Sequence, residues 1–172
     1  AELSNVGLAS GPISALKYEV VTQAVINPLL DFSIAIGTTT NNVATSSFID
    51  NNLLTQVYSS ASESFPVGVK TLTLITPYIW DGSSNIVVQI ISNSGDWDSG
   101  RGILKSHSTS TNQTTYISTD GETTAYFVNA TSGTAINYRP NTVFVGNVGC
   151  ISPAIEIPVT FAPKPAFELS SA

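Results

Sequence analysis

Apolar and polar residues alternate one by one along several stretches of this chain, and this period of two limits the fold more than any other feature. Phe32, Ile34 and Ile36 alternate with small or polar residues, and the same pattern recurs over residues 16–20 and 70–74. Because successive side chains of a strand point to opposite faces of a sheet, these stretches predict β-strands with one face on a core and one in water.

We expect eight or nine such strands, separated by turns rich in Gly, Pro, Asn and Asp. Their predicted ranges are 13–21, 30–38, 54–60, 68–76, 85–93, 102–108, 114–119, 124–129 and 142–146. Residues 86–91 and 143–145 are apolar on both faces, which is typical of strands in the centre of a sheet. Helical periodicity is nowhere convincing, and residues 44–54 are expected to hold one short helical turn at most. The sequence therefore predicts an all-β fold, an antiparallel, jelly-roll-like β-sandwich.

Composition narrows the class of protein further. Hydrophobic residues make up 42% of the 172 residues, whereas charged residues make up only 10%, so the polar surface must consist mainly of Ser, Thr and Asn. This composition suits an extracellular, secreted or cell-surface β-protein. With a net charge of -6 and six Lys and Arg in all, a nucleic-acid partner is not expected. Without an apolar run of about 18 residues, membrane insertion by a helix is not expected either.

The sequence pattern changes near the end of the chain, from residue 151 onward. We expect residues 1–150 to form the sandwich, residues 151–161 to form an edge strand or a lead-in to a following module, and residues 162–172 to be a linker or tail. Residues 155–161 still alternate, and Pro163 and Pro165 then favour a stiff, extended spacer. The lone cysteine, Cys150, is expected to be a small buried residue, with pairing to a neighbouring domain or chain as the alternative.

Several segments in a fixed order resemble a known family of modules. The most specific runs from Pro77 to Val88 and contains Trp-Asp-Gly-Ser-Ser-Asn; the others are 10–16, 32–39, 57–58, 138–141 and 150–154. Together, over about residues 8–161, they resemble a β-sandwich module of large secreted and surface proteins of Bacteroidota, typically exported by the type IX system. The resemblance implies a place outside the cell and an adhesive or architectural role, but no ligand. Many relatives carry a second Cys in the strand that corresponds to 85–93, and here that strand has none.

The Trp-Asp-Gly segment has a structural interpretation first. Asp81 and Gly82 form a dipeptide that favours tight turns, and Asn85 is placed to cap the other side of the loop. Trp80 is expected to anchor the end of the preceding strand in the core. The alternative is that Trp80 is an exposed platform on which a sugar ring stacks.

The candidate binding loop is residues 94–102. It combines Asp96, Trp97, Asp98 and Arg101 with three glycines between two predicted strands, and recognition usually sits in such loops. Asp96 and Asp98 are candidates for Ca²⁺ ligands, and Ca²⁺ is the one cofactor considered. A glycan or protein contact is the second interpretation, and a solvated loop in which Arg101 pairs with an Asp is the simplest.

A catalytic site is not indicated. His107 is the only histidine and is expected at the surface, and a triad or zinc site needs partners that the sequence does not supply. The sequence therefore predicts a non-enzymatic adhesive or structural module of a large bacterial surface protein. Its expected partners are neighbouring modules, copies of itself and surface glycans. A carbohydrate-binding module of a secreted enzyme and a self-assembling filament subunit are the alternatives.

Overall fold

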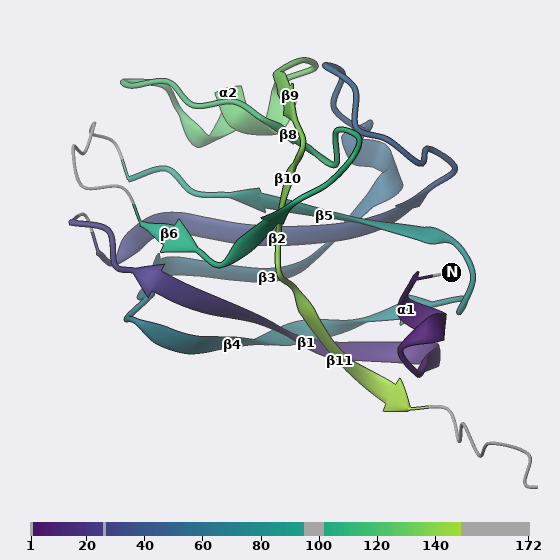
Figure 1. Ribbon diagram of the computed structural model, residues 1–172. Coiled ribbons are helices and arrows are strands. Elements are labelled where there is room, and N and C mark those ends of the chain that lie inside the picture. The colour runs from purple at the N-terminus through teal and green to yellow at the C-terminus, as the bar shows by residue number, and fades with distance from the viewer. Residues whose placement is uncertain (1, 26, 95–101, 149–172) are drawn as a thin grey trace, which may run out of the picture.

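The computed structural model describes residues 2–25, 27–94 and 102–148, which form an antiparallel all-β sandwich (Figure 1). The predicted fold class is confirmed. The elements in chain order are α1 (Glu2–Asn5), β1 (Leu8–Thr22), β2 (Leu29–Thr39), the 3-10 helix η1 (Asn51–Leu53), β3 (Leu54–Glu63), β4 (Gly68–Trp80), β5 (Asn85–Ile91), β6 (Ile103–Leu104), β7 (Ser106–Ser108), β8 (Thr114–Tyr116), α2 (Thr124–Asn129), β9 (Thr134–Ile136), β10 (Tyr138–Pro140) and β11 (Val143–Val148).

Two sheets make the sandwich. The first has the strand order β11-β1-β4, with β6 also paired to β1, and the second has the order β3-β2-β5. All their pairings are antiparallel. The eleven described strands exceed the eight or nine expected because β6 to β10 are separate segments of only two or three residues.

The core lies between these two sheets. Leu16 of β1 and Ile34 and Ile36 of β2 are completely buried, and the other core side chains also come from β1 to β5. Their alternation in the sequence places them on the inner faces of the strands, and burial of each such side chain stabilises the fold by roughly 1.5–3 kcal/mol. The period of two therefore identified the core correctly.

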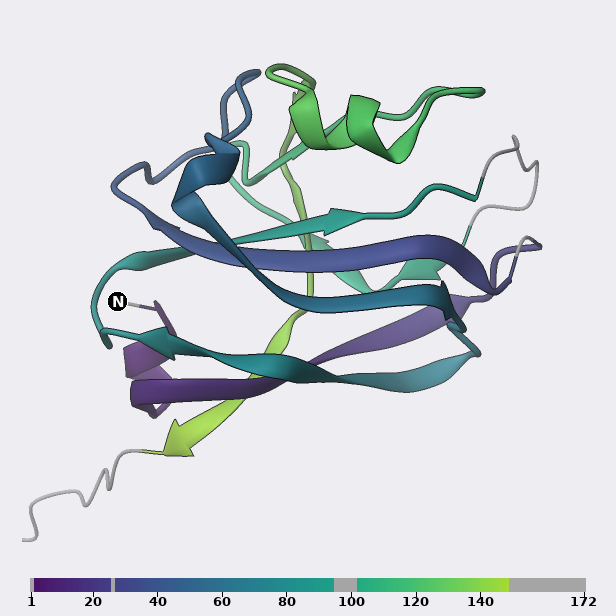
Figure 2. The same ribbon diagram turned by 180° about the vertical axis from the view of Figure 1, so that it is seen from behind.

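Residues 106–142, which we term the cover layer, form a separate group beside the sandwich. They contain two two-stranded ladders, β7 with β10 and β8 with β9, and the helix α2. Figures 1 and 2 show β8, β9 and α2 on the side of β5 that faces away from β1 and β4. The chain between β2 and β3, residues 40–53 (the β2–β3 loop), meets this layer through backbone hydrogen bonds.

One expectation about this region was wrong, and the strand predicted at 102–108 is present in two pieces, β6 and β7. Residues 124–129 form the helix α2 rather than a strand, because the Thr123 side chain accepts a hydrogen bond from the Tyr126 N–H at 3.2 Å and so caps a helical turn. The predicted strand at 102–108 is interrupted at Lys105, whose N–H donates to Glu19 O and whose carbonyl accepts from the Asn141 N–H. The helical turn expected within 44–54 is present as η1.

The sheet positions of β5 and β11 also differ from expectation. Both read as central strands, yet in the described part of the chain β5 pairs with β2 alone and β11 with β1 alone. Ile86 and Val88 of β5 pack against the core, which explains why one face of this strand is apolar. In the described residues no helix is long and apolar enough to cross a membrane.

Candidate functional site

The loop predicted as a binding site lies outside the described residues. Asp96, Trp97, Asp98 and Arg101 all fall within 95–101, so their roles in binding a ligand or Ca²⁺ remain predictions. The described flanks show that this segment connects β5, in one sheet, to β6, in the other. The predicted boundaries at 151–161 and 162–172, and Cys150, also lie outside the described residues.

The turn between β4 and β5 is built as a structural unit. Trp80 is only 2% exposed, and its indole N–H donates to the Ser84 carbonyl oxygen at 2.9 Å. Gly82 has a φ of +85°, and an added Cβ would approach Ser10 Cβ at 3.1 Å, so a glycine suits this position. Asn85 donates from its side chain to Asn41 O at 3.2 Å, which ties the turn to the β2–β3 loop.

Asp81 organises the inside of the same turn. Its Oδ1 accepts from the backbone N–H groups of Ser83 at 2.7 Å and Ser84 at 2.8 Å, and its other oxygen accepts from the Ser84 hydroxyl. These hydrogen bonds, from the Ser84 side chain first, lower the pKa of Asp81 to about 2. The carboxylate is thus engaged within the turn, and buried Trp80 does not offer its ring face to a sugar.

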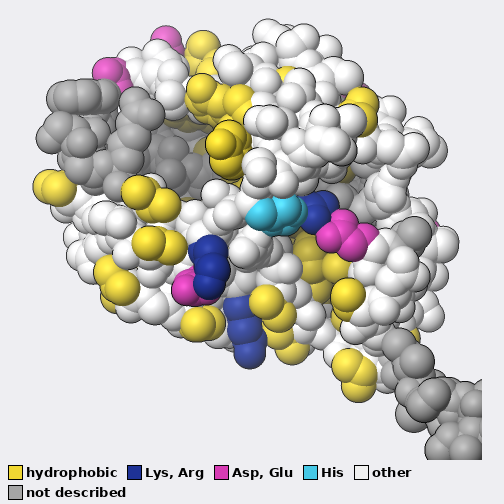
Figure 3. Space-filling view, viewed as in Figure 1, with side chains coloured by type: hydrophobic (Ala, Val, Ile, Leu, Met, Phe, Trp, Pro, Cys, Tyr) yellow, Lys and Arg dark blue, Asp and Glu magenta, His cyan; other side chains and the backbone are white. Residues whose placement is uncertain are grey.

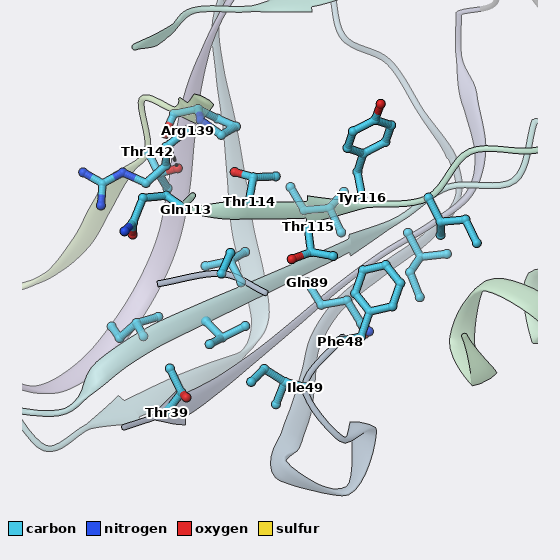
Figure 4. Close-up of a pocket in the computed structure, with 18 of the residues that line it drawn as sticks. Thr39, Phe48, Ile49, Gln89, Gln113, Thr114, Thr115, Tyr116, Arg139 and Thr142 are labelled. Atoms are coloured by element: carbon cyan, nitrogen blue, oxygen red, sulfur yellow. Dashed lines mark hydrogen bonds between the residues drawn. The ribbon is translucent and has the colours of Figure 1, made fainter. Parts of the chain in front are cut away.

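A large cavity among the described residues runs along β5. Its volume is about 1520 Å³, and every residue of β5 lines it. The opposite walls come from the β2–β3 loop, the cover layer and the start of β11. Figure 4 shows side chains from these walls, among them Gln89 of β5, Thr115 of β8 and Phe48 of the β2–β3 loop. We term this space the β5 cleft.

The lining of the β5 cleft is largely neutral. Hydroxyl and amide side chains dominate its polar part: Thr39, Asn41, Asn42, Thr45, Gln89, Thr109, Thr111, Gln113, Thr114, Thr115 and Thr142. Many of them also hold the walls together. Gln113 donates to Asn42 O at 2.9 Å and Thr115 donates to Thr45 O at 2.6 Å. Sequence reasoning missed this group, because Thr and Asn are frequent throughout the chain and no spacing distinguishes those in the cleft.

Charged groups gather at one end of the cleft. Arg139 of β10 makes two hydrogen bonds to the Glu2 carboxylate of α1, at 2.7 and 3.0 Å. The hydrogen bonds from Arg139 are the main cause that lowers the pKa of Glu2. His107 pairs with Arg139 in the β7–β10 ladder, and its Nδ1 lies 2.7 Å from Asn141 Oδ1. His107 is exposed, as expected, and Arg139 forms an ion pair with Glu2.

A second charged group lies away from the cleft, at the hairpin between β3 and β4. Glu63 accepts hydrogen bonds from Tyr58 and Lys70, and it is the one buried charged residue in the described chain. Burial is the largest cause that raises the pKa of Tyr58 to about 12, and the carboxylate of Glu63 adds to it. Contacts with Lys70 and Tyr58 outweigh burial at Glu63 and lower its pKa. This group closes the hairpin of the sandwich and shares no residue with the cleft.

Among residues 2–25, 27–94 and 102–148, no three His, Cys, Asp or Glu side chains come together in a way that would hold a metal ion. The geometry that this part of the molecule offers is therefore a neutral cleft bordered by an edge strand. Comparisons with family models, with curated proteins and with solved structures found no match to this chain.

Proposed function

We propose that this chain is a non-enzymatic, extracellular adhesive and structural module of a large bacterial cell-surface protein. The observation that carries the proposal is the character of its surface. Figure 3 shows few charged side chains on one face of the molecule, where most of the surface is neither charged nor hydrophobic. A surface rich in hydroxyl and amide groups packs against other surfaces without the cost of removing charges from water.

The outer face of β4 supports the same proposal. Val69, Ile75 and Ile79 are 71%, 68% and 70% exposed, although Leu72 and Leu74 of the same strand are buried. These exposed side chains offer apolar surface that contact with another protein would remove from water. The resemblance to modules of Bacteroidota surface proteins, carried by residues 77–88 above all, supports the cellular location.

Antibodies against the folded chain test this proposal on cells of the source organism. We expect labelling of intact cells, and retention of beads coated with the purified protein on surfaces that the cells colonise. Beads coated with the heat-unfolded protein serve as the control. Labelling that requires permeabilised cells would rule out a role at the cell surface.

A carbohydrate-binding module of a secreted enzyme is the second candidate. It is favoured by the order of the strands, because Trp97 falls in the sequence between β5 of one sheet and β6 of the other, and connections between strands of a sandwich often carry recognition. A glycan array tests it with the wild type, Trp97→Ala and, as a control at an exposed aromatic position, Tyr138→Ala. Binding that is lost in Trp97→Ala alone supports a sugar site there. Equal binding by all three proteins argues against it.

A further inference from the structure

Strand β5 has the side chains of a central strand and the position of an edge strand. Ile86, Val87, Val88, Ile90 and Ile91 are apolar and β-branched, so both faces of the strand suit burial. Yet among the described strands only β2 pairs with it, along the register from Asn85 with Thr39 to Ile91 with Ser33. One edge of β5 therefore presents backbone N–H and C=O groups without a ladder partner in the described chain.

That edge borders the β5 cleft. All residues of β5 line the cleft, and β8, which lines another wall of it, is paired with β9 instead. An edge strand with apolar side chains on both faces is a template for another strand, because main-chain groups in a partly buried place require hydrogen-bond partners. The cleft volume of about 1520 Å³ exceeds the range of roughly 300–1,000 Å³ typical for small ligands. An extended peptide fits both the edge and the volume.

We propose that a second copy of this chain donates its residues 155–161 as an added strand along β5. This inference rests on the proposed structural role and names its partner and mode of contact. The donated segment lies outside the described residues, and its sequence carries the argument. Ile155, Ile157, Val159 and Phe161 form one apolar face, and Glu156, Pro158 and Thr160 form the other. In strand addition, main-chain hydrogen bonds supply affinity and alternate side chains fill pockets.

Pro158 specifies which edge of the donated strand is used. The N–H groups of successive residues in a strand point to opposite edges, so those of Ile157 and Val159 share one edge and the position of Pro158 belongs to the other. Proline has no N–H to donate. Within strands it therefore occurs where its nitrogen faces an edge that is not hydrogen-bonded to a neighbouring strand. A donated strand would therefore pair with β5 through Ile157 and Val159 and leave its other edge unpaired.

The direction of β11 favours a donor in another copy. Figures 1 and 2 show that β11 runs away from the cover layer and ends on the side of the molecule opposite to β5. Strand β11 therefore ends on a different side of the molecule from the β5 edge. If each copy donated a strand to the next, the sandwiches would assemble into a linear polymer.

The test uses the full chain and two variants matched in charge. Ile157→Asp places a carboxylate on the apolar face of the donated segment, whereas Thr160→Asp places one on the other face. The molar mass in solution and the hydrogen exchange of residues 85–91 are measured over a dilution series. We expect the wild type and Thr160→Asp to gain mass with concentration, and exchange in β5 to slow by about tenfold or more. Ile157→Asp should stay monomeric, with fast exchange in β5.

Three results would overturn the proposal. The first is a wild type that stays monomeric with unprotected β5 at every concentration. The second is self-association that survives in Ile157→Asp, which would place the contact on another surface. The third is protection of β5 in a monomer, independent of concentration and lost in Ile157→Asp, which would assign the added strand to the same molecule. Antibody labelling of intact cells does not depend on Ile157. If the self-association experiment fails, the proposed cell-surface location is unaffected. If the labelling experiment fails, the proposed strand addition along β5 is unaffected.

Discussion

The sandwich and the cover layer are held together by different forces. Every buried hydrophobic side chain of the described chain belongs to β1–β5, whereas each residue of the cover layer, 106–142, is half-buried or exposed. The five strands β1–β5 of the sandwich run for seven to fifteen residues, whereas the four strands of the cover layer run for three each. Apolar burial thus stabilises the first region, and it contributes much less to the second.

Hydrogen bonds attach the cover layer to the sandwich instead. The Ala44 N–H donates to Asn112 O, the Phe48 N–H to Thr131 O and the Gly133 N–H to Ser46 O, at 2.8, 3.0 and 2.8 Å. Each such bond contributes a net stabilisation of only about 0.5–1.5 kcal/mol, because water competes for the same groups. The comparison teaches that one fold can combine a hydrophobic core with a region held mainly by hydrogen bonds, and the β5 cleft lies between the two.

Removal of a core side chain gives the largest effect and tests this contrast directly. Ile34→Ala, in the centre of β2, should lower the free energy of unfolding by about 2–5 kcal/mol, and Ile34→Val by about 0.5–1.5 kcal/mol, as measured by urea denaturation. Phe127→Ala, at a half-buried position of α2, should cost clearly less than Ile34→Ala. If Phe127→Ala costs as much as Ile34→Ala, the cover layer is part of the core and the contrast fails.

A pair of glycines separates global from local destabilisation. A Cβ added at Gly37 in β2 would lie 2.4 Å from Leu53 O, and one added at Gly133 would lie 2.4 Å from Tyr116 O. We expect each Ala variant to be overpacked, at a cost of about 1–3 kcal/mol. Gly37→Ala should lower the midpoint of global unfolding. Gly133→Ala should mainly accelerate hydrogen exchange in residues 112–133, with the exchange of β1 and β2 unchanged; uniform acceleration would contradict a separable cover layer.

The hydrogen bond from Tyr58 to Glu63 shows how the sandwich itself uses polar contacts. Tyr58→Phe should cost about 1 kcal/mol near neutral pH. Because the pKa of Tyr58 is raised to about 12 in the fold, from about 10 when unfolded, the contribution of its protonated form is complete below pH 10 and is lost as pH rises towards 12. The difference in Tm between the wild type and Tyr58→Phe should therefore shrink over that range. A difference that is constant with pH would contradict this account.

The smallest expected effect concerns the turn at Asp81. Its pKa is lowered to about 2, so its contribution to stability is present above pH 4, where the unfolded chain is also ionised, and is lost as pH falls towards 2. The difference in Tm between the wild type and Asp81→Asn should be small, because the carboxylate is exposed to solvent, and should decrease between pH 4 and pH 2. An increase over that range would mean that the turn hydrogen bonds do not favour the ionised form.

The accuracy of the sequence-based predictions follows the same division of the molecule. In the sandwich, the alternation over 32–36 and 70–74 predicted strands and buried side chains that the structure confirms. In the cover layer, the strand expected at 124–129 is a helix, and β9 and β10 were not predicted. Segments that bury little apolar surface carry a weak periodic signal, so one capping side chain such as Thr123 decides their conformation.

The sequence by itself determined the all-β class, the strands of the sandwich and the turn at Asp81 and Gly82, because those depend on local periodicity and on turn chemistry between near neighbours. Only the tertiary structure decided that β5 is an edge strand of the described sheet, that Arg139 meets Glu2, and that a neutral cleft separates β5 from β8. These features join residues that are far apart in the chain. Strand order depends on which strands pair in the folded molecule. The apolar side chains of β5 are compatible with a central position and with an edge position, so the sequence of β5 does not fix its place in the sheet.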